Sequence, residues 1–306
     1  MGGTPPSAPT GQVNNISPNS TDFQVTSGST TAKSNFIFAT EDGTIAAWSN
    51  ATGAVRVVDN STSGAVYKGL AIGDSSSGFV IYATNFNSGK IDVFDHNFAP
   101  ITLSGNFTDP SPPPVPPGTP AGQTYAPFNV QVLNGNLYVT YALQDAAKHD
   151  AVAGAGNGFV DEFDLNGHLI QRVATNGPLD SPWGLDIAPA GFKAFANDLL
   201  IGNFGDGVID VYNSVTNLFV GQLDDASGSP IMIDGLWALA NGTGANGFDA
   251  NSVYFTAGIN GEMDGLFGSL AAVPEPATLV LFGTGLAGLG FIRRRKTGRS
   301  VVASYS

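Results

Sequence analysis

Side chains that carry oxygen recur just after apolar runs along the 306-residue chain. Carboxylate and amide oxygens from successive repeats could converge on one rim and hold Ca²⁺, which accepts such ligands. A metal ion held there would polarise a substrate, as in metal-dependent lactonases and lyases. The same residue types also favour turns, because Asn and Asp tolerate the left-handed backbone conformation. Both interpretations stay open for Glu41, Asn85, Asn203, Asp206 and Asn260.

Other catalytic arrangements find little support. The chain has no Cys, which excludes a thiol nucleophile, a disulfide framework and a Cys-ligated metal. Its three His are scattered, and no Gly-x-Ser-x-Gly elbow accompanies them. Adjacent acids such as Asp161 and Glu162 would face opposite sides of a strand. We therefore predict no catalytic residues and no enzymatic activity, with the Ca²⁺-dependent enzyme acting on sugar-derived substrates as the alternative.

The charge balance excludes one class of partner. The chain has 25 acidic and 12 basic side chains, for a net charge of −13. Five of the basic residues follow position 292, so the preceding body is more acidic still. Such a body repels phosphate, whereas nucleic-acid binding draws on Lys and Arg contacts. We therefore exclude nucleic acid as a partner.

The elements that position these side chains are short strands. Abundant Gly and few charged residues argue against a helical bundle and for strands joined by turns. Several segments combine an apolar run, a turn containing Gly and an alternating strand, which is the signature of a β-hairpin. These segments are Phe36–Trp48, Phe79–Phe94, Leu137–Phe163, Leu199–Tyr212 and Val253–Phe267.

A further apolar strand precedes four of the hairpins at a regular interval. These strands start at Gly69, Asn129, Gly184 and Gly235, with spacings of 60, 55 and 51 residues. Repeats of this length with several strands are typical of propeller blades. We predict an all-β fold, a β-propeller of about five to six short four-stranded blades, with an unrepeated β-sandwich as the alternative.

The domain boundaries follow from composition. The propeller is expected over residues 36–272, with an extended, exposed proline-rich loop at 109–120. Residues 1–35 are rich in Ser, Thr, Pro and Asn and are expected to be irregular. The first blade would then lack its inner strand and be incomplete.

An apolar segment near the end of the chain predicts a helix. Residues 277–292 carry no charge, and a basic cluster follows them. At about 1.5 Å per residue the segment spans roughly 24 Å, and snorkelling of the basic side chains brings it close to a ~30 Å bilayer core. We predict a transmembrane helix at 277–292 with the basic cluster in the cytoplasm and the body outside. A buried core helix or strand is the alternative.

The segment 273–299 resembles the PEP-CTERM sorting signal of Gram-negative bacteria, and a short tail, 300–306, follows it. The resemblance implies recognition and cleavage near the Pro-Glu-Pro by an exosortase. It also implies export through the inner membrane, often in bacteria that make extracellular polysaccharide. The residues expected to be recognised are Pro274, Glu275, Pro276, Arg293, Arg294, Arg295 and Lys296.

The start of the chain departs from that pattern, because it has neither a charged start nor an apolar core. We therefore expect the true start to lie upstream of Met1. The body resembles an uncharacterised family of exported propellers, a resemblance that implies fold and export and supplies no catalytic residues. It rests on Phe38–Ile45, Pro127–Val130, Leu137–Ala142 and Ser181–Leu185.

Together these features predict an exported protein of the cell envelope or extracellular matrix with an unknown ligand. The expected partners are the exosortase, the inner membrane, and extracellular polysaccharide or matrix proteins. The body would be anchored transiently at the inner membrane and then reach the cell surface or matrix. No cofactor is expected, and Ca²⁺ belongs only to the alternative.

Overall fold

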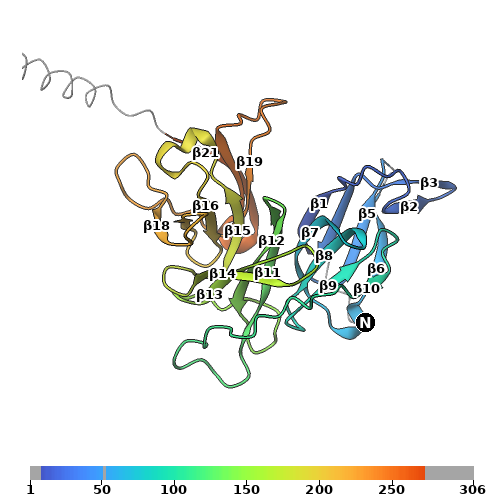
Figure 1. The fold of residues 1–306 in the computed structure, drawn as a ribbon, viewed down its shortest axis with the longest axis horizontal. Coiled ribbons are helices and arrows are strands. Elements are labelled where there is room, and N and C mark those ends of the chain that lie inside the picture. Colours follow the sequence, from blue (N-terminus) through green and yellow to red (C-terminus); the bar gives the residue numbers. More distant parts are fainter. Residues whose placement is uncertain (1–7, 51–52, 273–306) are drawn as a thin grey trace, which may run out of the picture. The chain divides into compact units, whose positions relative to one another are not determined.

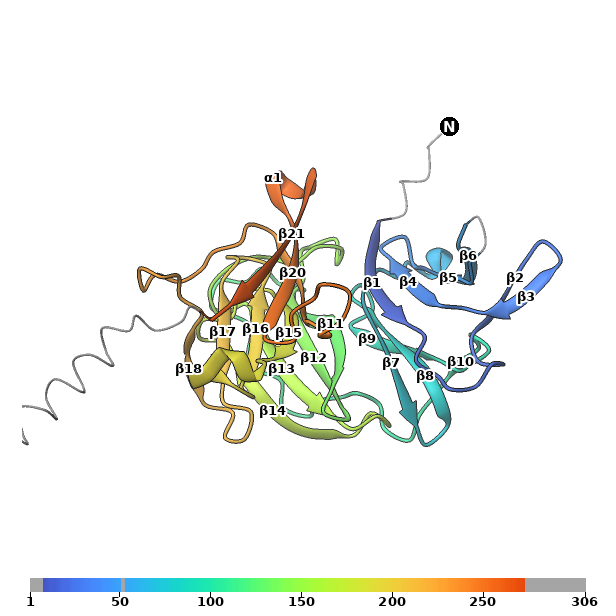
Figure 2. The ribbon, with the colours of Figure 1, turned by 90° about the horizontal axis from the view of Figure 1, so that it is seen from above.

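The computed structural model describes residues 8–50 and 53–272. These residues form a five-bladed β-propeller whose sheets follow one another in chain order, from the blue sheet around β1 to the orange one around β20 (Figures 1 and 2). All pairings are between antiparallel neighbours, apart from one isolated parallel bridge. The prediction of an all-β propeller is confirmed, with the blade count at the lower end of the expected range.

In each sheet the inner strand comes first in the chain, and the later strands follow outward. The first contains β1 (Pro9–Asn14), β4 (Phe36–Thr40), β5 (Thr44–Trp48) and β6 (Val55–Asp59). The second contains β7 (Tyr67–Ser75), β8 (Gly78–Asn85), β9 (Lys90–Phe94) and β10 (Pro100–Ile101). The third contains β11 (Tyr125–Leu133), β12 (Asn136–Leu143), β13 (Gly158–Phe163) and β14 (Leu169–Thr175). The fourth contains β15 (Pro182–Ile187), β16 (Leu199–Asn203), β17 (Ile209–Tyr212) and β18 (Phe219–Gln222). The fifth contains β19 (Leu236–Asn241), β20 (Ser252–Gly258) and β21 (Asp264–Ala271).

The remaining elements are short. A separate hairpin pairs β2 (Gln24–Ser27) with β3 (Thr30–Lys33). Two 3₁₀ turns, η1 (Ser61–Ser63) and η2 (Ala190–Phe195), and one short helix, α1 (Ile259–Glu262), lie in connections. Within the described ranges, none of the helices is long and apolar enough to cross a bilayer. The predicted helix at 277–292 lies outside the described residues.

The hydrophobic core is divided into layers between consecutive sheets. Ile37 and Ile45 of the first sheet pack with Ile81 of the second, and all three are fully buried. Equivalent clusters join the second sheet to the third, the third to the fourth and the fourth to the fifth. Alternation along each strand supplies side chains to both faces of a middle sheet. The core therefore depends on each sheet contacting its neighbours in the chain.

Glycine lets the backbones of neighbouring inner strands come into contact. A Cβ on Gly11 of β1 would overlap the backbone nitrogen of Leu70 in β7. A Cβ on Gly69 of β7 would lie 2.8 Å from the Cα of Asn129 in β11, and Gly184 of β15 is equally crowded by β19. The regular spacing of Gly69, Asn129 and Gly184 in the sequence therefore marks the contact points of the inner strands.

The start of the chain differs from the prediction. For the described residues 8–35, the expectation of an irregular segment is wrong, as is that of an incomplete first blade, because β1 pairs with β4 as the inner strand of a four-stranded sheet. Its sequence, Pro9–Asn14, offers only one large apolar side chain, Val13, so the usual alternation of a strand is missing. Among the described residues, the sheet with three strands is instead the last one.

The proline-rich stretch 109–120 forms no helix or strand. Its first residue, Asp109, makes an ion pair with Arg172 of β14, and Arg172 also donates from Nη2 to the Ser111 carbonyl at 3.2 Å. Arg172 makes a second ion pair with the buried Asp161 of β13. One guanidinium therefore fixes the start of the loop to the third sheet.

Replacing Gly69 with alanine tests the inner-strand contact. We expect Gly69→Ala to lower the free energy of unfolding by about 2–3 kcal/mol, because the new methyl group must displace the backbone of β11. Gly265→Ala in β21 is the control, since a Cβ there has no heavy atom within 4 Å. Chemical denaturation measures both, and equal losses in the two variants would contradict the contact.

Asp186 gives the fold a measurable pH dependence. Burial raises the pKa of its carboxyl to about 6, against hydrogen bonds donated by Ile187 and Asn241. The protonated Asp186 carboxyl therefore makes its full contribution to the free energy of unfolding below about pH 4, and this contribution is lost as the pH rises through about 6. We expect the free energy of unfolding of Asp186→Asn, relative to the wild type, to rise by about 1–3 kcal/mol between pH 4 and pH 7.

Denaturation curves at several pH values measure that difference. Asp225→Asn is the control. Hydrogen bonds from Ser227 and Ser229 lower the pKa of this exposed carboxyl, so it stays ionised between pH 4 and pH 7 and its substitution should give a difference that changes little over that range. If the difference in free energy of unfolding between Asp186→Asn and the wild type stays constant with pH, the raised pKa of Asp186 is refuted.

Candidate functional site

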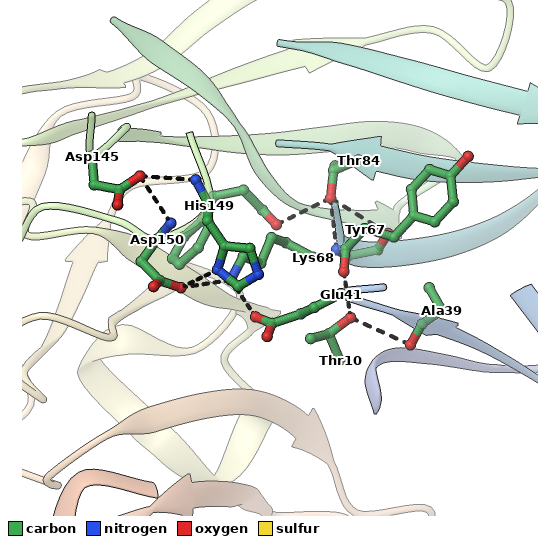
Figure 3. Close-up of polar contacts among 11 residues, drawn as sticks. Thr10, Ala39, Glu41, Tyr67, Lys68, Thr84, Asp145, His149 and Asp150 are labelled. Carbon is green, nitrogen blue, oxygen red and sulfur yellow. Dashed lines mark hydrogen bonds and ion pairs between the residues drawn. The ribbon is translucent and has the colours of Figure 1, made fainter. Parts of the chain in front are cut away.

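A buried lysine joins three sheets at the ends where the inner strands begin (Figure 3). Lys68, the second residue of β7, has a side chain that is 4% exposed. Its Nζ makes an ion pair with Glu41, which follows β4, and lies 3.3 Å from Oδ1 of Asp150, which follows β12. Buried charges are stable only when they are paired, so the two carboxylates explain how an ammonium tolerates this position.

Local hydrogen bonds place these charged groups. Thr10 of β1 donates from Oγ1 to the Tyr67 carbonyl at 2.7 Å, which fixes the backbone next to Lys68. Oδ1 of Asp145 accepts the backbone N–H groups of His149, at 2.8 Å, and of Asp150, at 3.2 Å. The loop that carries Asp150 is therefore held by a carboxylate turn.

The ionic environment extends to the fifth sheet. Glu262 in α1 is exposed, but partial loss of hydration raises its pKa, the charge of Glu41 raises it further, and Lys68 works in the opposite direction. Partial loss of hydration also acts to raise the pKa of the exposed Asp150, but the hydrogen bond with His149 and the charge of Lys68 outweigh it, so that pKa is lowered. We name Glu41, Lys68, Asp150 and Glu262 the rim cluster. Its three carboxylates outnumber its one ammonium, so the cluster itself carries a net negative charge.

A layer of aromatic rings crosses the same ends of the strands. Phe128 of β11 contacts Trp183 of β15 edge to face at 4.7 Å, and Trp183 contacts Trp237 of β19 in the same way at 4.5 Å. Phe86, which directly follows β8, and Phe204, which directly follows β16, complete the layer. Trp183 is 3% exposed, so this ring acts in packing and offers no open face.

A cavity of about 450 Å³ lies among the inner strands. Residues of β1, β7, β11, β15 and β19 all line it, including Gln12, Leu70, Gln131, Trp183 and Ala240. Its lining contains no charged side chain. We name this cavity the channel. It adjoins the rim cluster through Thr10, which lines the channel and binds the carbonyl just before Lys68.

Two of the residues predicted as metal ligands serve the sheets themselves. Asn85, at the end of β8, donates to Asp92 of β9 at 3.0 Å. Asn203, at the equivalent end of β16, donates to Asp210 of β17 at 2.9 Å. Each amide therefore ties the second strand of its sheet to the third, which explains why the two positions recur in the sequence.

The other three predicted residues also have separate partners. Asp206 accepts the Val208 N–H at 3.0 Å within its own turn, and Asn260 donates to Asp264 at 2.8 Å. Glu41 alone enters the rim cluster. Across residues 8–50 and 53–272, no group of three or more His, Cys, Asp or Glu could hold a metal ion. Four of the five predicted residues thus have hydrogen-bond partners within their own sheet or turn, and whether any of them holds a metal stays a prediction.

Sequence reasoning missed Lys68, Asp150 and Glu262. They occupy different positions in their repeats, so no periodic signal marks them. The predicted sorting-signal residues, Pro274–Pro276 and Arg293–Lys296, lie outside the described residues.

Removing the buried ammonium tests the rim cluster. We expect Lys68→Met to lower the free energy of unfolding by about 3 kcal/mol, because Glu41 keeps a charge without its partner. Adding Glu41→Gln should restore part of that loss, since it removes the unpaired charge. Asp150→Asn is the control: its side chain is 67% exposed, so we expect a change below about 1 kcal/mol. Strictly additive losses in the double variant would contradict the pairing.

Three uncharacterised proteins of Acanthamoeba polyphaga mimivirus are similar to this chain. R648 is 31% identical over 274 residues, covering 86% of this chain and 63% of R648. R640 is 29% identical, covering 80% of this chain and 44% of R640, and L690 is 32% identical, covering 67% and 51%. The chain therefore spans between 44% and 63% of the length of these relatives.

Solved structures with low sequence identity also align with the chain. A nidogen/laminin complex gives a TM-score of 0.48 at 14% identity, covering 73% of this chain and 67% of that one. A putative gluconolactonase gives 0.47 at 12% identity, covering 89% and 83%. Neither likeness bears on activity.

The end of the chain gives a match of a different kind. Residues 272–296 match the PEP-CTERM protein-sorting motif, in the place where the Pro-Glu-Pro, the apolar segment and the basic cluster predicted it. This match supports an exported protein that is sorted through its C-terminal segment.

Proposed function

We propose that this protein is an exported β-propeller that binds an extracellular ligand and is sorted and cleaved by an exosortase. The observation that carries the proposal is the position of the sorting motif. β21 ends at Ala271 and the motif begins at residue 272, so the motif follows the last strand directly. Cleavage near Pro274–Pro276 would remove the tail without cutting β21.

In this proposal the tail acts before the propeller does. Residues 277–292 anchor the protein transiently in the inner membrane, with the basic cluster at 293–296 on the cytoplasmic side. The propeller then lies outside the cytoplasm, and cleavage passes it to the cell surface or matrix. Extracellular polysaccharide and matrix proteins are the proposed surroundings of the mature protein.

A binding role suits the geometry better than catalysis does. The rim cluster pairs its ammonium with carboxylates, and among the described residues it contains no Ser, Thr or Tyr nucleophile next to a base. The channel offers a cavity of about 450 Å³, within the range of roughly 300–1,000 Å³ that small-molecule sites occupy. Recognition by shape and hydrogen bonding is the chemistry that such a cavity supports.

The sorting step can be tested in the host bacterium. We expect an epitope-tagged product of the full-length gene to lose everything beyond the Pro274–Pro276 region when the exosortase is present and to keep its tail when it is absent. Mass spectrometry of the C-terminus gives the answer. Glu275→Ala should keep its tail in both strains, and Glu262→Ala, outside the motif, should be processed normally. If the wild-type protein keeps its tail in both strains, the proposal of cleavage by an exosortase is wrong.

A further inference from the structure

The channel has a wall of uncharged hydrogen-bonding groups. Each inner strand lies at one end of its sheet and pairs with another strand along one edge only. The backbone N–H and C=O groups of the second edge therefore have no partner strand. Side chains bond some of them, such as the carbonyls of Tyr67 and Trp183, and the others are left for water or a ligand. Because all five inner strands line the channel, these groups surround it.

Amide side chains add to this wall. Gln12 and Asn14 of β1 and Gln131 of β11 line the channel and are exposed or half-exposed. Within the part of the chain that the structure describes, none of the three side chains makes a hydrogen bond to another residue. Each amide therefore offers a carbonyl acceptor and an NH₂ donor to whatever occupies the channel.

Apolar groups lie between these polar ones. Half-buried Val13 and Val132 and exposed Ala238 and Ala240 line the same cavity, while charged side chains are absent from the lining. A charged ligand would lose its hydration without gaining a counter-charge, which is costly. A purely apolar ligand would leave the backbone and amide groups without partners, which is also costly. The lining fits a molecule that presents hydroxyl groups and C–H surfaces together.

The rim cluster sharpens this selection. Its three carboxylates lie at the end of the channel marked by Thr10, and they outnumber the single ammonium of Lys68. The field of such a rim lowers the local concentration of anions. Acidic sugars are therefore disfavoured both at the rim and inside the channel.

We propose that the channel binds a neutral, hydroxyl-rich small molecule of the sugar or polyol class. This inference rests on the proposed role as a binding protein and names the class of ligand. The inner-strand edges and the amides of Gln12, Asn14 and Gln131 hold the hydroxyl groups, and the side chains of Val13, Val132 and the two alanines contact the C–H faces.

Isothermal titration calorimetry on the purified chain tests the proposal with four neutral probes, glucose, cellobiose, glycerol and myo-inositol, and with glucuronate as the charged counterpart. We expect at least one neutral probe to bind at millimolar concentration or below and glucuronate to bind at least tenfold more weakly than glucose. No binding by any neutral probe overturns the proposal, as does glucuronate binding as tightly as glucose.

A variant that fills the channel locates the site. Ala240 of β19 lines the channel and is exposed, so Ala240→Phe projects a ring into the cavity without disturbing the core. We expect it to weaken binding of the best neutral probe at least tenfold while the melting temperature stays unchanged. Ala245→Phe, in an exposed loop outside the channel, should bind as the wild type does. Equal binding by both variants overturns the assignment.

A second variant tests the hydrogen-bonding groups of the channel without filling the cavity. Gln131→Leu keeps the size of the side chain and removes its amide, and we expect a threefold to tenfold loss of affinity. Unchanged affinity contradicts the role of this amide. Processing of Ala240→Phe in the host separates the two proposals. If this variant is cleaved normally but does not bind the probe, the channel proposal is supported independently of sorting. If the wild type is not cleaved, the sorting proposal fails and the channel proposal is unaffected.

Discussion

The close approach of neighbouring inner strands is the constraint on which the rest of this structure depends. Gly11, Gly69 and Gly184 allow backbone to lie against backbone where any side chain would overlap. That contact sets the distance between consecutive sheets, and so the thickness of the hydrophobic layers between them. It also sets the width of the channel, because the same strands form its wall. Fold and candidate binding site thus share one geometric cause.

Where glycine is absent from the equivalent position, a polar side chain makes the link. Asn129 of β11 donates from Nδ2 to the Trp183 carbonyl of β15 at 2.7 Å, which joins the third sheet to the fourth. Thr84 of β8 accepts the Gly69 N–H and donates to the Phe128 carbonyl, at 2.6 and 3.1 Å. Many buried polar groups in this acidic chain therefore serve the contacts between sheets, which a functional interpretation of the same residues must take into account.

The sequence predicted the repeating parts of the structure well. Spacing of Gly69, Asn129 and Gly184 located three inner strands, because each repeat meets the same steric demand. β1 escaped prediction because Gly11 stands among Pro, Thr, Gln and Asn, where alternation is weak. β1 is a strand because it pairs with β4, and this pairing cannot be inferred from the sequence of β1 alone.

The rim cluster could not be predicted for a different physical reason. Lys68, Asp150 and Glu262 come from loops and strand ends far apart in the chain, and only tertiary packing brings their charges together. The recurring Asn85 and Asn203 gave a clear signal, but the repetition reflects a tie between strands of one sheet. Repetition thus identified what every sheet needs, whereas the candidate site uses residues that differ from sheet to sheet.

The way the sheets are joined has a consequence for how the propeller comes apart. Apart from the β2–β3 hairpin, which comes between β1 and β4, each sheet is built from consecutive strands, and within residues 8–50 and 53–272 no strand is shared between the first sheet and the last. Four of the hydrophobic clusters each connect two neighbouring sheets, as in a linear array of repeats, and the aromatic layer runs from the second sheet to the fifth without reaching the first. The two terminal sheets each have one packed partner, so they open at lower free energy than the middle three. Local unfolding therefore starts at the sheets of β1 and β19, and the backbone amides of the third sheet are the last to lose their protection from hydrogen exchange.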